Sequence, residues 1–312
     1  MKHKLLILMS FIISINIYGQ GLIDHTFIDF NTFEEQIQET YPNPENQLLS
    51  VEGKAVADIG SELFMLDNWL VSLTNSSGEN KISQRDSYSK KVTSGEQGTV
   101  LGVRIKFPEW PYSGEALIRP KFPILPFTKD GKYANINNGV LTNVGTIKEF
   151  TLWANGRNFP FTIGVRVTDL KGKISEFGLG SLFFVGWRNL SYKNPFFSDR
   201  IINNIKPNNR IYPSDIPLIR FEHIAIYRPG NYAGGDFVSY FGNMKVSYTP
   251  YLTDIPTDIN DEETWGIISD QQELRASGIN SALYEEILQY EYAKKRVQTE
   301  NNNENTENEY PE

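Results

Sequence analysis

The chain has 312 residues, of which 39% are hydrophobic and 13% aromatic, and its formal net charge is -8 at pH 7. This length allows one large all-β domain or two ordinary domains. The net negative charge argues against a general affinity for nucleic acid or for anionic lipid surfaces. Because the sequence has no cysteine, a disulfide framework, thiolate metal sites and a lipid-modified cysteine are excluded.

Residues 1–19 have the pattern of a secretory signal peptide. Lys2 and Lys4 precede an apolar run from Leu5 to Ile17, and the small residue Gly19 follows. The run has about 13 residues, whereas a helix that spans a membrane needs about 20. We therefore expect cleavage near Gly19 and no insertion into the membrane. An exported chain without cysteine favours a bacterial periplasm or cell surface.

The first third of the remaining chain shows weak and short patterns. We expect a strand from Leu22 to Phe30, a short helix from Phe33 to Glu39 and a strand from Trp69 to Leu73. The polar stretch from Thr74 to Gln97 predicts a loop or a weak hairpin.

The segment from Thr99 to Pro108 has the clearest strand pattern in the chain. Its apolar residues alternate with polar or small ones, so that one face carries the apolar set Leu101, Val103, Ile105 and Phe107. A period of two predicts a strand with one buried face and one face toward solvent.

Similar patterns continue to about Tyr248. We expect strands at residues 150–154, 163–167, 177–184, 188–192, 218–227 and 237–248, with a hairpin turn at Asp169–Lys173. The apolar phase slips by one residue between Phe221 and Ile224, which predicts a β-bulge.

Five prolines crowd the segment that follows the clearest strand, at positions 108, 111, 120, 123 and 126. Proline lacks the backbone donor of a ladder, so we expect an irregular segment that wraps an edge of a sheet. Many short antiparallel strands without alternating helices predict an all-β fold, an antiparallel β-sandwich of the jelly-roll (lectin-like) type.

The composition changes after Pro250. We expect a β-sandwich domain over residues 20–250, an extension over 251–298 with one helix from Ser281 to Gln298, and an acidic tail over 299–312. The helix has acidic residues in its first turns and Lys294, Lys295 and Arg296 in its last, as the helix dipole favours. The tail is rich in Asn and Glu without Lys or Arg, a composition typical of disorder.

No pattern in the sequence predicts a catalytic, cofactor-binding or metal site. His25 and His223 lie within apolar strand-like runs, where a histidine is more often a packed residue than a ligand. The acidic run from Asp258 to Glu263 lacks the glycine and the later glutamate of a calcium loop. Gly178–Gly180 and Gly234–Gly235 lack the context of a phosphate loop, and we interpret them as kinks and turns.

Besides a purely structural role, two other functions are compatible with the sequence. Trp110, Trp153 and Trp187 could stack on sugar rings, which would suit a glycan-binding jelly-roll module of the periplasm or cell surface, although aromatic residues are more often core residues. A glycoside hydrolase would need two well-placed carboxylates, and the abundance of acids alone is no evidence for them.

Several stretches that lie between about Leu22 and about Ile267 form an ordered series. They are Thr99–Pro108, Ala116–Pro120, Asn143–Lys148, Gly156–Pro160, Gly186–Leu190 with Asn194–Pro195, Arg210–Pro213, Ile226–Arg228, Gly234–Val238 and Trp265–Ile267. In this order they resemble the flagellar filament outer layer protein (FlaA) family, the sheath proteins of spirochaete periplasmic flagella.

This resemblance implies a non-enzymatic structural protein without cofactors, exported to the periplasm. It further implies contacts with flagellin-type core filament subunits and other sheath proteins, and self-association along the filament. A coat of this kind would change the stiffness and curvature of the filament, and so cell motility.

Repeated contacts that do not close into rings build filaments. The predicted helix has an apolar stripe formed by Leu283, Ile287 and Tyr290, and Trp265 and Ile267 precede it. An amphipathic helix outside a sandwich must dock somewhere. We take these five residues as candidate assembly contacts, with docking of the helix on its own domain as the equal alternative.

Overall fold

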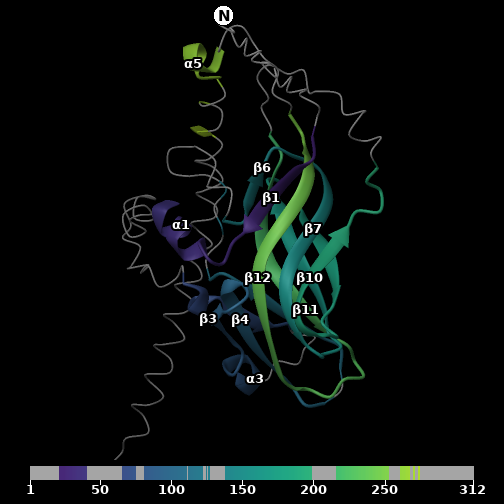
Figure 1. Cartoon of the computed structure of the whole chain (residues 1–312). Helices are drawn as coiled ribbons and strands as arrows, with labels where there is room; N and C mark the ends of the chain where they lie inside the picture. Colours follow the sequence, from purple (N-terminus) through teal and green to yellow (C-terminus); the bar gives the residue numbers. More distant parts are fainter. Residues whose placement is uncertain are drawn as a thin grey trace, which may run out of the picture.

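The computed structural model describes residues 21–40, 65–74, 81–110, 112–121, 124, 126, 138–198, 216–252, 261–267, 270 and 273–274. Within these ranges the chain forms two antiparallel β-sheets that pack face to face as a β-sandwich (Figure 1). The fold class predicted from the strand patterns is confirmed. The described strands all lie between Ile23 and Pro250.

In the described part of the chain, six strands form the first sheet, here called sheet A. Its order is β10-β7-β12-β4-β3, and β1 also pairs with β12. The bounds are β1 Ile23–Ile28, β3 Tyr88–Ser94, β4 Gly98–Phe107, β7 Val144–Arg157, β10 Val185–Lys193 and β12 Gly235–Pro250.

Sheet B likewise contains six described strands, in the order β2-β5-β11-β8-β9, and β6 pairs with β11. The bounds are β2 Leu70–Leu73, β5 Gly114–Arg119, β6 Val140–Thr142, β8 Thr162–Asp169, β9 Ile174–Ser181 and β11 Leu218–Arg228.

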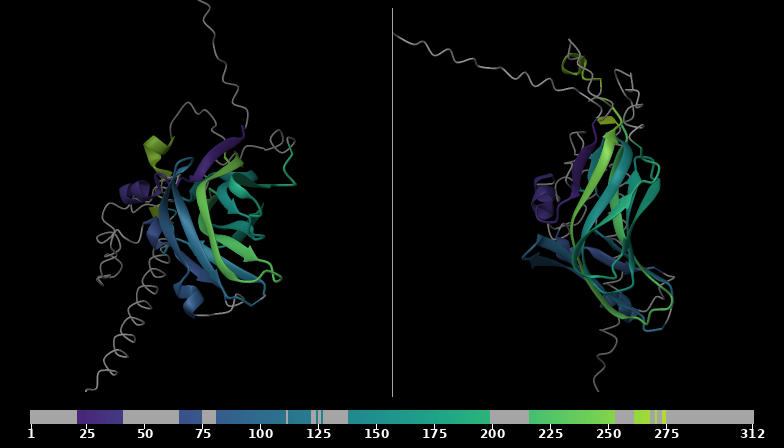
Figure 2. Two further views of the ribbon diagram at one scale, coloured as in Figure 1. Left: turned by 60° about the horizontal axis from the view of Figure 1, so that its bottom comes forward. Right: turned by 45° about the vertical axis from the view of Figure 1, so that its right-hand side comes forward.

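The described helices are short and peripheral. They are α1 Phe33–Thr40, the 3₁₀ turn η2 Leu66–Asn68, α3 Lys81–Arg85 and α5 Asp261–Trp265. Helix α1 lies beside β3 and β4 (Figure 2), where Lys91 Nζ contacts Glu34 Oε2 at 2.6 Å. None of the described helices is long and apolar enough to cross a membrane.

The core between the two sheets is rich in phenylalanine. One ring cluster joins Phe27 of β1, Phe150 of β7, Phe221 of β11 and Trp69, which precedes β2. A second cluster surrounds Phe161, which comes directly before β8. Aromatic rings bury large areas and interlock at defined angles, so both sheets are held by the same aromatic layer.

Strand β11 contains the predicted bulge. Its register with β8 shifts between Phe221 and His223, at the position where the apolar phase slips in the sequence. The shift keeps Phe221, Ile224 and Ile226 in the core and places His223 and Tyr227 on the outer face, where both contact Arg166. The prediction of the bulge is confirmed.

Three expectations need correction or completion. The proline-flanked segment is not irregular where it is described between Gly114 and Arg119, because β5 forms there and lies between β2 and β11 inside sheet B. The polar stretch before β4 does form a hairpin, β3 with β4, and it also contains the unpredicted helix α3. The helix predicted over residues 281–298 and the tail over 299–312 lie outside the described residues.

Gly234 allows two chain segments to approach each other closely at the turn between β11 and β12. Its backbone N–H donates to the carbonyl of Glu109 at 3.3 Å. A Cβ at this position would lie 1.6 Å from the carbonyl oxygen of Pro108. Gly235 begins β12 with a φ of 115°, so the pair lies in the connection and at the start of the strand, in agreement with its interpretation as kinks and turns.

We expect Gly234→Ala to lower the free energy of unfolding by about 2 kcal/mol, because the backbone must shift to remove the overlap. Urea unfolding measures the change. Gly178→Ala is the control, since a Cβ there would meet no atom within 4 Å. A loss as small as that of the control would contradict the close approach.

Candidate functional site

The predicted assembly residues are not brought together by the described structure. Trp265 ends helix α5 and is 67% exposed, and Ile267 lies two residues further and is partly buried. Leu283, Ile287 and Tyr290 lie outside the described residues. The expectation of a shared apolar stripe therefore stays a prediction.

A more pronounced surface lies on the outer side of sheet A. We call it the cation–aromatic face. It is formed by side chains from five neighbouring strands, namely Tyr88 and Lys90 of β3, Arg104 and Lys106 of β4, Asp236 and Tyr240 of β12, Arg157 of β7 and Trp187 of β10.

The strand register explains why these residues gather. Arg104 is the partner of both Tyr88 and Val238, and Asn155 is the partner of both Tyr240 and Trp187. Side chains opposite each other on one face of a sheet lie about 5 Å apart. Residues distant in the sequence thus form rows across the sheet.

A glycine makes room for the central ring of this face. A Cβ at Gly102 would lie 3.2 Å from Cδ1 of Tyr240 and 2.9 Å from Cγ2 of Val92. The Tyr240 ring therefore lies close to the backbone of β4, and the Arg157 guanidinium lies 5.0 Å from its centroid. Cation–π contacts of this kind favour arginine over the ring face.

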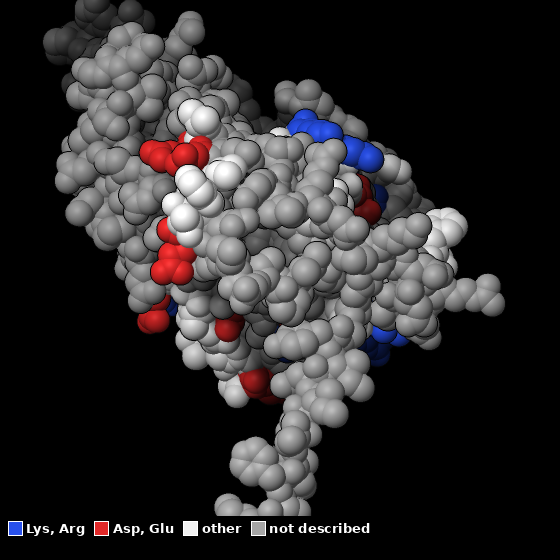
Figure 3. Space-filling model, turned by 90° about the horizontal axis from the view of Figure 1, so that it is seen from above, with Lys and Arg blue, Asp and Glu red and all other residues white. Residues whose placement is uncertain are grey.

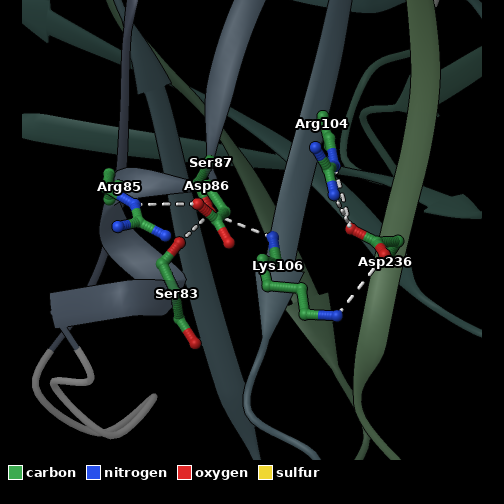
Figure 4. A network of polar contacts seen from close by, with 7 residues as sticks. All are labelled: Ser83, Arg85, Asp86, Ser87, Arg104, Lys106 and Asp236. Atoms are coloured by element: carbon green, nitrogen blue, oxygen red, sulfur yellow. Dashed lines mark hydrogen bonds and ion pairs between the residues drawn. The ribbon is translucent and has the colours of Figure 1, made fainter.

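Asp236 is the carboxylate of the face, and two cations share it. Arg104 Nη2 lies 2.9 Å from its Oδ1 and Lys106 Nζ lies 3.4 Å from its Oδ2 (Figure 4). Partial burial would raise the pKa of Asp236, but the hydrogen bond from Arg104 and the nearby positive charges lower it. The carboxylate is thus charged at neutral pH, and the face keeps more cations than acids.

Sheet B carries a second polar cluster on its outer face, centred on Arg166 of β8. The guanidinium contacts Glu115 of β5 at 2.7 Å, Glu176 of β9 at 2.8 Å and the hydroxyl of Tyr227 at 2.7 Å. The Tyr227 hydroxyl in turn donates to Glu176 at 2.6 Å. The cluster ties four strands together by charge-assisted hydrogen bonds.

The charges in this cluster are fixed by their neighbours. Burial alone would raise the pKa of Glu176, but the hydrogen bonds from Tyr227 and Arg166 lower it. Burial would likewise lower the pKa of Arg166, but the hydrogen bond to Glu176 and the other nearby groups raise it. A general acid of a glycosidase needs a raised carboxyl pKa, whereas the pKa of Glu176 is lowered.

His223 is held neutral at the edge of the same cluster. Its Nε2 lies 3.1 Å from Arg166 Nη1, and since a guanidinium can only donate, this ring nitrogen accepts. Burial and the charge of Arg166, opposed by Glu222 and Glu176, lower the pKa of His223 to about 4. The expectation of a packed histidine agrees with this position.

We expect stability to fall as the pH decreases from about 6.5 toward 4, because the unfolded state binds a proton on His223 in this range and the folded state does not. The free energy of unfolding should lose about 1–3 kcal/mol over the range. Urea unfolding at pH 7 and pH 4.5 measures the loss. His223→Gln should show a smaller loss, and an equal loss would contradict the assignment.

The three tryptophans considered for sugar stacking lie on β7, on β10 and after β4. Trp153 and Trp187 lie diagonally on neighbouring strands, since Trp153 pairs with Asn189 and Trp187 with Asn155. Trp110 follows β4 and its ring contacts that of Tyr112. Among the described residues no group of three or more His, Cys, Asp or Glu could hold a metal ion.

Comparison with known proteins decides the family. Residues 31–257 match the family of the flagellar filament outer layer protein FlaA. The chain belongs to the flagellar filament outer layer protein family. The matched range contains all residues of the cation–aromatic face and of the Arg166 cluster, whereas Trp265 and Ile267 lie beyond it.

Three relatives carry the name flagellar filament outer layer protein. The one from Spirochaeta aurantia is 32% identical over 247 residues, which cover 75% of this chain and 72% of the relative. The one from Treponema pallidum is 29% identical and covers 54% of each chain. The one from Borreliella burgdorferi is 26% identical and covers 68% of this chain and 62% of the relative.

Solved structures give only weak likenesses to this family member. TmCBM61 in complex with β-1,4-galactotriose aligns with 61% of this chain and 95% of its own, at 10% identity and a TM-score of 0.28. A structure from the β-sandwich superfamily of carbohydrate-binding modules aligns with 58% of each chain, at 10% identity and a TM-score of 0.31. At these scores the likenesses carry no functional argument.

The sequence patterns missed the cation–aromatic face of this outer layer protein. Each contributing strand shows a polar residue at an alternate position, such as Lys90, Arg104 or Arg157. The gathering depends on the strand order β3-β4-β12-β7-β10, which no local pattern specifies. The alternation of Arg, Lys and Tyr with apolar residues on several strands was the sequence feature that could have predicted this face.

Proposed function

We propose that this chain is a structural, non-catalytic subunit of the outer layer that surrounds the periplasmic flagellar filament. The observation that carries the proposal is the family match over residues 31–257, which spans nearly all described strands. The fold supports it, because two sheets locked by a shared aromatic core make a stiff building block.

The proposed effect is mechanical. A coat placed outside a rod adds material where it resists bending most, and so it raises the bending stiffness. A coat with a defined subunit repeat also favours one curvature of the filament. By changing the stiffness and the curvature of the filament, the protein would determine how the rotating filament deforms the cell. It would thereby affect motility.

The proposed location and partners follow from the same role. Residues 1–19 would direct export and be removed, leaving the protein in the periplasm. There it would contact flagellin-type core subunits and other sheath proteins, and associate with further copies of itself. The sandwich over residues 20–250 would be the coat unit, with the extension over 251–298 and the tail over 299–312 outside it.

Assembly through the extension remains part of this proposal, with Trp265, Ile267, Leu283, Ile287 and Tyr290 as contacts. We expect Trp265→Ala to reduce the amount of protein recovered with purified filaments severalfold, because the exposed indole is a large apolar anchor. Trp110→Ala is the control, since Trp110 is also exposed. Equal recovery of both variants would contradict a role for Trp265.

The test of the function uses intact periplasmic flagella. They would be purified, and their proteins identified by mass spectrometry alongside the periplasmic fraction. The proposal predicts that this chain copurifies with the filaments in a fixed ratio to the core subunits. Its absence from filaments, together with its presence in the rest of the periplasm, would contradict the proposal.

A further inference from the structure

The charge of the cation–aromatic face is opposite to that of the whole molecule. The chain has a net charge of -8, yet this face carries Lys90, Arg104, Lys106 and Arg157 against the single carboxylate of Asp236. Arg104 and Lys106 share that carboxylate. Lys90 and Arg157 are exposed, and no described acid pairs with either.

We propose that the cation–aromatic face binds the acidic segment 299–312 of a neighbouring copy of this chain. This contact is one through which copies of the chain would associate, and its relevance to the filament rests on the proposed function. Arginine and lysine would pair with the glutamates, and the rings of Tyr88, Tyr240 and Trp187 would contact the uncharged residues between them.

The composition of the segment favours it as the occupant. Residues 299–312 contain five glutamates, at positions 300, 304, 307, 309 and 312, and no lysine or arginine. They lie outside the described residues and beyond residue 257, where the family match ends. The contact would therefore distinguish this chain from family members that lack such a segment.

The proposed coat favours a neighbouring copy over the same one, because a coat needs contacts between copies, whereas the 48 residues of 251–298 are long enough to reach either. Strand β12 begins at the cation–aromatic face, near Asp236, and ends at Pro250. With a rise of about 3.4 Å per residue, these two points lie on the order of 45 Å apart. The chain thus leaves the sandwich at the end opposite the face, and α5 lies beyond that end (Figure 1).

Seen from the end near α5, most of the described acidic side chains in view lie on one side of the molecule and most of the lysine and arginine side chains in view lie on the other, where acidic side chains are also visible (Figure 3). Copies stacked along the strand direction would bring the acidic segment of one to the basic face of the next. Such a head-to-tail contact is heterologous and extends into a filament.

The experiment measures binding of a fluorescent peptide with the sequence of residues 299–312. The receptor is the full chain in which the five glutamates of the segment are replaced by glutamine, so that its own segment does not compete. We expect anisotropy to rise with receptor concentration, and the affinity to fall at high salt. A peptide with the same five Glu→Gln changes should not bind.

Variants of the receptor locate the site. K90Q/R157Q should weaken binding at least about fivefold, since each lost surface ion pair contributes modestly. R104Q should weaken peptide binding less, because the Arg104 guanidinium is already paired with the carboxylate of Asp236. K171Q/K173Q removes two exposed cations from the β8–β9 turn of sheet B and is the matched control. Equal affinities for K90Q/R157Q and this control would overturn the proposal, as would absence of peptide binding.

Two further outcomes would also overturn it. If the unmodified full chain stays monomeric in sedimentation and binds the peptide more weakly than the five-glutamine receptor does, the segment occupies its own copy. If the protein instead binds a glycan in an array, and Trp187→Ala abolishes that binding, the ligand of the face is a sugar. Concentration-dependent association, abolished by the five Glu→Gln changes, is the expected result.

These results are independent of the test of function. Copurification with filaments can hold while peptide binding fails, in which case the sheath role stands and only this contact is wrong. Conversely, association through the face in a chain absent from filaments would contradict the proposed function alone.

Discussion

Arg228→Met should lower the free energy of unfolding by about 3 kcal/mol or more. Arg228 is 2% exposed and is the last residue of β11. It donates to the carbonyls of Pro108 at 2.9 Å and Trp110 at 2.7 Å, and also to that of Tyr232. Methionine keeps the apolar stem but removes every donor, so these carbonyls lose their charged partner.

Urea unfolding followed by tryptophan fluorescence measures the effect of this change. Arg188→Met is the matched control, because Arg188 is exposed and its guanidinium stacks on Phe184 at 4.5 Å without a buried ion pair. The control should lose less than about 1 kcal/mol. Similar losses in both variants would show that the buried guanidinium does not fasten the segment after β4.

Phe161→Ala should destabilise the fold by about 3–5 kcal/mol, as expected for a large ring removed from a packed core. Phe161 is 1% exposed. Its ring lies 5.4 Å from that of Phe107 and 5.1 Å from that of Phe237, both of sheet A, and 5.2 Å from that of Tyr232. Its removal leaves a cavity between the sheets.

Phe183→Ala provides the comparison for this second variant, since Phe183 is 62% exposed in the turn between β9 and β10. Its loss should change stability by less than about 0.5 kcal/mol. Thermal unfolding of the two variants beside the parent measures the difference. A stability of Phe161→Ala within the range of the Phe183 variant would contradict a core shared by both sheets.

The strand patterns predicted most of the sandwich because solvent on one face and a core on the other impose a period of two. Strand β4 shows this directly, with Val103, Ile105 and Phe107 buried and Arg104 and Lys106 toward solvent. The bulge in β11 was predictable for the same reason, since an extra residue must shift the apolar phase.

Two elements escaped prediction for physical reasons. Strand β5 alternates between buried and half-buried residues, but the prolines on both sides suggested an irregular segment. They lie outside the strand, so the ladder loses no donor. Helix α3 has five residues, which is too short for a helical period to show in the sequence.

The surfaces were harder to predict than the core. Burial acts on each strand separately, so the core follows from local patterns. The cation–aromatic face and the Arg166 cluster each combine side chains from four or more strands, and they exist only through strand order and register. Arg166, Glu115 and Glu176 are ordinary surface residues in the sequence, and only the sheet brings them together.

We infer that this sandwich forms part of the coat of the periplasmic flagellum and that its effect on the filament is mechanical. Electron cryotomography of a strain lacking the chain, beside its parent and a complemented strain, tests it most directly by measuring filament diameter and helical shape in place. We expect thinner or differently curved filaments in the deletion strain, and complementation should restore the parental diameter and shape. Filaments of unchanged diameter and curvature would contradict it.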